Sequence, residues 1–64
     1  MTKEEVEQVV THTGDCYRIK TRREPDAFNM YVSKIGEYGL EQDAGGDLPY
    51  RFVSYESIEW VRTY

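Results

Sequence analysis

The chain has 64 residues, enough for one small domain over residues 1–64 with a single layer of packed apolar side chains. Its composition is 39% hydrophobic and 31% charged with both signs interspersed, which excludes a disordered chain. A net charge of −4 argues against general affinity for nucleic acid or anionic lipid, and so small a core leaves little room for a catalytic pocket.

A single cysteine, Cys16, excludes an intramolecular disulfide and favours a reducing compartment. The first residues are charged and lack the apolar run of a signal peptide. No stretch approaches the roughly 20 apolar residues that span a bilayer. We therefore expect a cytoplasmic protein without membrane contact.

The N-terminal segment fits a capping box, in which Thr2 caps a helix and Glu5 reaches back to it. Val6, Val9 and Val10 follow at the spacing of one helical stripe. The same valines suit a strand, since β-branched residues are enriched there. We favour a short helix that gives way to strand near Val9, and the strand interpretation stays open.

The first clear turn is predicted at Gly14, which can take a positive φ at no steric cost. Residues 16–22 then alternate as a half-buried strand does. One face of this strand holds Tyr17, Ile19 and Thr21, and the other holds Arg18, Lys20 and Arg22. Pro25 ends the strand because it cannot donate to a ladder.

A second strand is predicted over residues 28–35, with Phe28, Met30 and Val32 on one face. Two glycines three residues apart then predict a bulge or tight bend. The second of them falls in a third predicted strand, residues 38–42.

The remaining third of the chain begins with a loop, which composition predicts at residues 43–47. A strand over 50–54 and one turn of 3₁₀ helix over 55–57 follow. The last strand covers 58–63, with Ile58 and Trp60 on one face.

Four to five short strands with turn signals every 8–12 residues predict a mainly all-β domain. We expect a small antiparallel barrel, SH3-like or Sm-like, with a short N-terminal helix. Closure into a barrel would remove the exposed edges of a flat sheet of this size.

Charge is uneven along the chain. Residues 1–15 hold one basic and four acidic residues, residues 16–34 hold five basic and two acidic residues, and residues 35–64 hold two basic and six acidic residues. Such segregation either makes a dipolar surface that steers a partner or pairs a basic strand with acidic neighbours. Both interpretations stay open.

Catalytic and metal-binding patterns are weak. His12 and Cys16 flank one turn, but a reactive pair needs an orienting third group and a pocket. One His and one Cys also fall short of the four ligands of structural zinc, and no glycine-rich phosphate loop precedes a helix. We expect no catalytic residue, no metal and no cofactor, so the protein is not predicted to be an enzyme.

The basic strand face is one candidate site. Alternation places Arg18, Lys20 and Arg22 about 7 Å apart, close to the spacing of successive phosphates along a nucleic-acid strand. Arg23 and a stacking ring from Tyr31 would complete a nucleic-acid-binding surface. Solubility alone also explains three cations on a solvent face.

The aromatic C-terminal segment is the other candidate. We expect Phe52 and one face of Trp60 to help build the core, with other rings partly exposed. Exposed Tyr and Trp are enriched in interfaces, and carboxylates suit the rim. The candidate protein-binding residues are Tyr50, Tyr55, Trp60, Tyr64, Glu56 and Glu59.

These observations predict a non-catalytic protein–protein interaction module, a small regulator or inhibitor of a larger complex. The alternative is a small barrel that binds nucleic acid through the basic strand face. We also expect a homo-oligomer, because so small a core is often supplemented by self-association.

Overall fold

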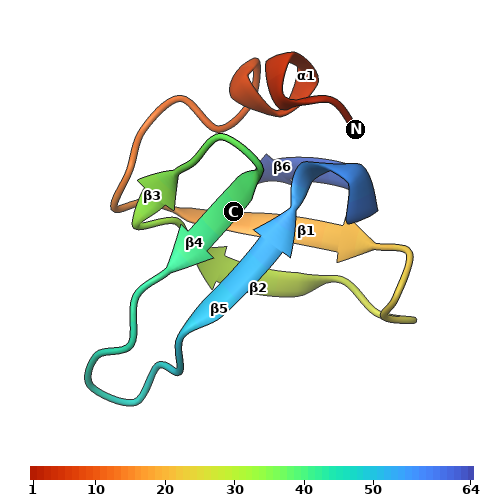
Figure 1. Cartoon of the computed structure of the whole chain (residues 1–64). Coiled ribbons are helices and arrows are strands. Elements are labelled where there is room, and N and C mark those ends of the chain that lie inside the picture. The colour runs from red at the N-terminus through yellow and green to blue at the C-terminus, as the bar shows by residue number, and fades with distance from the viewer.

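A computed structural model describes all 64 residues and places six strands in two three-stranded antiparallel sheets beside one short helix (Figure 1). The elements are α1 (Lys3–Glu7), β1 (Cys16–Thr21), β2 (Phe28–Tyr31), β3 (Lys34–Ile35), β4 (Gly39–Gln42), β5 (Arg51–Ser54), the 3₁₀ turn η1 (Tyr55–Ser57) and β6 (Ile58–Thr63). The predicted mainly-β class is confirmed. The one α-helix is too short to cross a membrane.

The capping box at α1 is confirmed. The Thr2 hydroxyl accepts from the Glu5 N–H at 3.2 Å, and the Glu5 carboxylate accepts from the Thr2 N–H at 2.8 Å. Hydrogen bonds from Thr2 hold the pKa of Glu5 below its usual value because they favour the carboxylate. Val6 and Val10 are buried and Val9 packs against the core, so the interpretation of this segment as a strand is wrong. The expected change to strand near Val9 is also wrong, because a turn follows α1 and the first strand begins at Cys16.

The first sheet has the order β2-β1-β6, with β1 in the middle. The predicted alternation of β1 is confirmed, since Tyr17, Ile19 and Thr21 are buried and the residues between them are not. Tyr17 lies opposite Met30 of β2, and Ile19 lies opposite Val61 of β6. This face therefore forms one wall of the core.

The second sheet has the order β3-β4-β5. Its strand β3 is the last part of the strand predicted at residues 28–35, whose first part is β2 of the first sheet. That strand is in fact two. The Val32 N–H still donates to Asp15 beside the first sheet at 3.1 Å, whereas the Ser33 N–H donates to Glu41 of β4 at 2.8 Å. The chain passes from one sheet to the other between these two residues.

The expected closed barrel is not confirmed. The strands β5 and β6, which η1 joins, belong to different sheets and do not pair. In Figure 1, β4 and β5 run across β1, and α1 lies at one end of the sheets. Eleven buried side chains from the helical segment, both sheets and η1 form the core: Val6, Val10, Tyr17, Ile19, Met30, Val32, Leu40, Val53, Tyr55, Ile58 and Val61.

A β-bulge in β6 overturns the prediction that Ile58 and Trp60 share a face. Thr21 pairs with Ile58 and the preceding Lys20 pairs with Trp60, so Glu59 is an extra residue without a partner. Ile58 is consequently buried, whereas Trp60 lies on the outside and is 38% exposed.

The prediction that Phe52 helps build the core is also wrong. Phe52 pairs with Glu41 on the outer face of the second sheet and is 49% exposed. Its ring packs over Gly39: a Cβ at that glycine would lie 2.8 Å from Phe52 Cζ and would collide with the Val53 carbonyl oxygen. Only a glycine lets the two strands and the ring come this close.

We therefore predict that Gly39→Ala lowers the free energy of unfolding by about 1–3 kcal/mol, because the methyl group forces the strands apart. The control is Gly45→Ala, whose Cβ would enter open space. Urea unfolding measures both. Equal stabilities of the two variants would contradict the close approach at Gly39.

A buried glutamine joins the two sheets. The Gln42 side chain of β4 accepts from the Tyr31 N–H of β2 at 3.0 Å and donates to the Pro49 carbonyl at 2.8 Å. Gln42 and Thr21 are the two buried polar side chains of the protein. Both halves of the Gln42 amide are thus satisfied, which a buried polar group requires.

We predict that Gln42→Met, which keeps the size of the side chain but removes its amide, costs about 1–3 kcal/mol of stability. The Tyr31 N–H and the Pro49 carbonyl would both lose their partner. Gln8→Met at an exposed position should change stability by less than about 0.5 kcal/mol. Equal stabilities of the Gln42 and Gln8 variants in urea unfolding would contradict the role of Gln42 in joining the two sheets.

Candidate binding face

The outer face of the first sheet gathers aromatic and basic side chains from all three strands. Directly opposite residues of antiparallel strands share a face, and the register pairs Arg18 with Asn29 and Arg62, Lys20 with Trp60, and Cys16 with Tyr31. We call this surface the Trp60 face; it comprises Arg18, Lys20, Asn29, Tyr31, Glu59, Trp60 and Arg62.

Each arginine of the Trp60 face has a partner that holds it in place. The Arg62 guanidinium lies 4.9 Å from the centre of the Trp60 ring, a cation–π distance. Arg18 Nη1 donates to Asn29 Oδ1 at 3.0 Å. Because Arg18 and Arg62 are directly opposite, their repulsion would destabilise the sheet, and these separate partners offset it.

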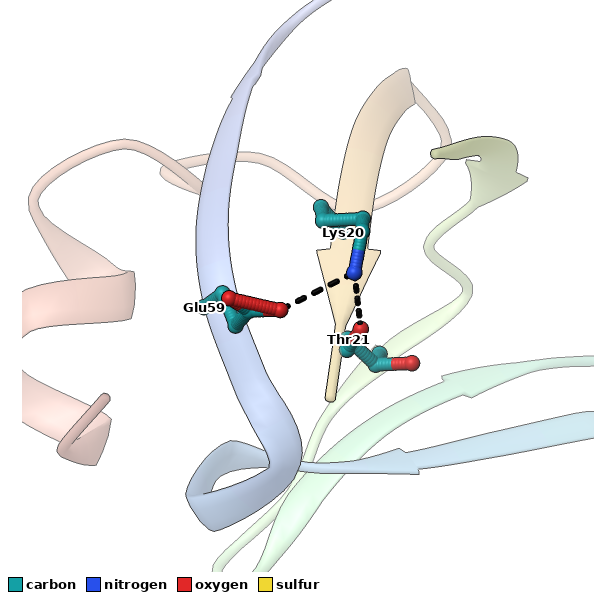
Figure 2. A network of polar contacts seen from close by, with 3 residues as sticks. All are labelled: Lys20, Thr21 and Glu59. Carbon is teal, nitrogen blue, oxygen red and sulfur yellow. Dashed lines mark hydrogen bonds and ion pairs between the residues drawn. The ribbon is translucent and has the colours of Figure 1, made fainter. Parts of the chain in front are cut away.

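Lys20 is already engaged within the protein. Figure 2 shows its ammonium group between Glu59 and the Thr21 carbonyl, to which it donates at 2.9 and 2.6 Å. Only 20% of its side chain is exposed. The bulge that leaves Glu59 without a strand partner therefore also supplies the counterion for Lys20.

The predicted basic stripe is thus divided into two parts. Arg18 and Lys20 lie on the Trp60 face, near Tyr31 on the neighbouring strand. Arg22 follows β1, where its N–H donates to the Ser57 carbonyl at 2.9 Å, and Arg23 is exposed beside it. The structure does not place all four cations in one row.

The six residues predicted to bind protein are likewise dispersed. Trp60 and Glu59 belong to the Trp60 face, and Glu56 is exposed in η1. Tyr64 follows β6 and is largely exposed. Tyr50 lies beside the second sheet, where its hydroxyl donates to Glu41 at 3.0 Å. That hydrogen bond raises the pKa of Tyr50.

Tyr55 is a core residue and cannot serve as an exposed anchor, because it is only 5% exposed. The 3₁₀ turn aims its ring into the core, and its hydroxyl donates to the Gly36 carbonyl at 2.5 Å. Burial, followed by the charge of Glu7, raises the pKa of this phenol.

We predict that Tyr55→Phe lowers the free energy of unfolding at pH 7 by about 1 kcal/mol, through loss of the hydrogen bond to Gly36. A pKa raised on folding stabilises the protein below the usual phenol pKa, and this contribution is lost as the pH rises through the folded value. The difference in the free energy of unfolding between the parent protein and Tyr55→Phe, measured by urea unfolding, should therefore become smaller above about pH 10. Tyr38→Phe, at an exposed tyrosine without a side-chain hydrogen bond, should have little effect at either pH.

No hydrogen bond joins His12 and Cys16 across the turn before β1. His12 Nδ1 is 2.9 Å from the Thr11 hydroxyl, and Cys16 is a partly buried free thiol at the start of β1. Gly14 has the positive φ predicted for it, 87°. No group of three or more His, Cys, Asp or Glu side chains is placed to hold a metal ion.

Arg62 and Asn29 are the residues of the Trp60 face that sequence reasoning missed. The spacing of two between Trp60 and Arg62 within a predicted strand was a usable signal, because such residues share a face. Asn29 carries no comparable signal, since its role depends on the pairing of β1 with β2.

Comparisons with models of protein families, with curated proteins and with solved structures find no match for this chain.

Proposed function

We propose that the protein is a non-catalytic binding module that docks a protein partner on the Trp60 face. The observation that carries this proposal is the grouping of Trp60, Tyr31 and two arginines on one sheet surface. Trp, Tyr and Arg dominate binding energy at interfaces because they bring large contact areas and directed hydrogen bonds. Such a module acts by occupying a surface of a larger complex, as a regulator or an inhibitor does.

The charge of the Trp60 face indicates the chemistry of the partner. Arg18 and Arg62 have no carboxylate partner, whereas Lys20 is neutralised by Glu59. The face is therefore positive although the chain as a whole is negative. An acidic segment with apolar side chains complements it, with carboxylates for the arginines and apolar groups for the rings.

Nucleic-acid binding is the second candidate, favoured by the presence of Tyr31 and Trp60 among cations on one open sheet. Single-strand binders use this combination, in which bases stack on rings and cations follow the backbone. The net charge of −4 and the engagement of Lys20 by Glu59 weigh against it.

We also propose that the two sheets are the halves of a partly open SH3-like barrel. Three observations support this arrangement: the chain crosses between sheets after Val32, the first and last strands pair, and η1 separates the last two strands. Gln42 lies at the junction, so the stability of its Met variant also tests this arrangement.

We predict that Trp60→Ala weakens binding of the partner by about 30-fold or more, as truncation of an interface anchor does. The protein is immobilised, a partner is captured from a lysate of the source cells, and its affinity is then measured with both proteins purified. Tyr38→Ala, at an exposed ring outside the Trp60 face, should leave the affinity unchanged.

Two results would contradict this proposal. One is equal loss of affinity in the Trp60 and Tyr38 variants. The other is tight, steeply salt-dependent binding of a mixed RNA and single-stranded DNA pool that Arg18→Ala abolishes, which would establish the nucleic-acid alternative.

A further inference from the structure

We propose that a polar groove beside η1 is a binding site for a phosphate monoester. Two adjoining open hollows of about 330 and 340 Å³ share Arg23, Ser54 and Ser57. Thr21 lines one hollow, and Arg22 and Glu56 line the other. The site is separate from the Trp60 face, and the inference does not depend on the function proposed above.

The groove is held in shape by one hydrogen bond between distant segments and by one local hydrogen bond at η1. The Arg22 N–H donates to the Ser57 carbonyl at 2.9 Å, which fastens the end of β1 to η1. The Ser57 hydroxyl donates to the Ser54 carbonyl at 2.8 Å. The two arginines and the two serines are therefore neighbours in the folded chain before any ligand arrives.

Two of the three cations that line the groove have no counterion. The three ion pairs of the protein engage Lys20, Lys34 and Arg51, which leaves Arg22 and Arg23 without one. Glu24, which also lines the groove, is neutralised by Arg51 at 2.5 Å. Glu56 is the remaining carboxylate at the site, and it opposes the binding of an anion.

This donor set fits a phosphate monoester better than a diester. A monoester carries a charge of about −1.5 to −2 and three free oxygens, so two guanidinium groups can each donate to it in bidentate fashion. The Ser54 hydroxyl makes no hydrogen bond within the protein, which leaves it able to donate as well. A long polyanion such as nucleic acid would meet the surplus acidic residues of the chain.

The test is a two-dimensional amide NMR titration of the full chain with inorganic phosphate, N-acetyl phosphoserine amide, dimethyl phosphate and a short oligothymidine, at one ionic strength. We expect saturable shifts at residues 22–23 and 54–57 with a monoester. The two monoester probes distinguish free phosphate from a phosphorylated side chain as the source.

Arg22→Ala with Arg23→Ala should weaken monoester binding by about tenfold or more. Glu56→Gln should strengthen it, and this gain of affinity tests the site even if the double variant fails to fold. Lys34→Ala, at a cation on the second sheet, is the matched control and should bind as the parent does.

Three results would overturn the inference. They are the absence of saturable shifts with either monoester, shifts that survive in the folded double variant, and binding of dimethyl phosphate or oligothymidine as tight as that of the monoesters.

Discussion

One extra residue in β6 decides which side chains the first sheet hides and which it presents. Without the bulge at Glu59, strict alternation would bury Trp60 beside Ile58 and turn Val61 outward. With the bulge, Ile58 and Val61 both enter the core. Trp60 is released to the outer face, where it meets Arg62, and Glu59 is left free to neutralise Lys20. The Trp60 face and the core therefore depend on the same irregularity.

The two sheets share a core of eleven buried side chains, and polar side chains reinforce the contact between them. Gln42 links β4 to the backbone of β2, and the Tyr55 hydroxyl links η1 to Gly36 in the turn between β3 and β4. Both groups are buried and paired, so losing either partner would leave an unsatisfied polar atom inside the protein. Such interactions fix one arrangement of the sheets in a way that non-directional apolar packing does not.

The sequence predicts the features whose cause is local. The capping box joins residues three apart, and the alternation of β1 lies within six consecutive residues, so both were predicted and found. The division of the strand at residues 28–35 depends on Ser33 bonding to Glu41, which no local pattern shows. The outward turn of Trp60 depends on the pairing of β6 with β1, about 40 positions away in the sequence. The spacing of three between Ile58 and Val61 was the one local hint of a bulge.

Part of the uneven charge along the sequence is paired across strands in the fold, as Lys20 is with Glu59 and Lys34 is with Glu41. The arginines without a carboxylate partner lie on the Trp60 face, which holds Arg18 and Arg62, and in the groove beside η1, which holds Arg22 and Arg23. On the function proposed above, these arginines would attract an acidic partner although the net charge of the chain is negative. Attraction of this kind acts mainly on the rate of association and is screened by salt, while the packed rings set the rate of dissociation. In the proposed complex, charge would select the side on which the partner arrives, and Trp60 would set how slowly it dissociates.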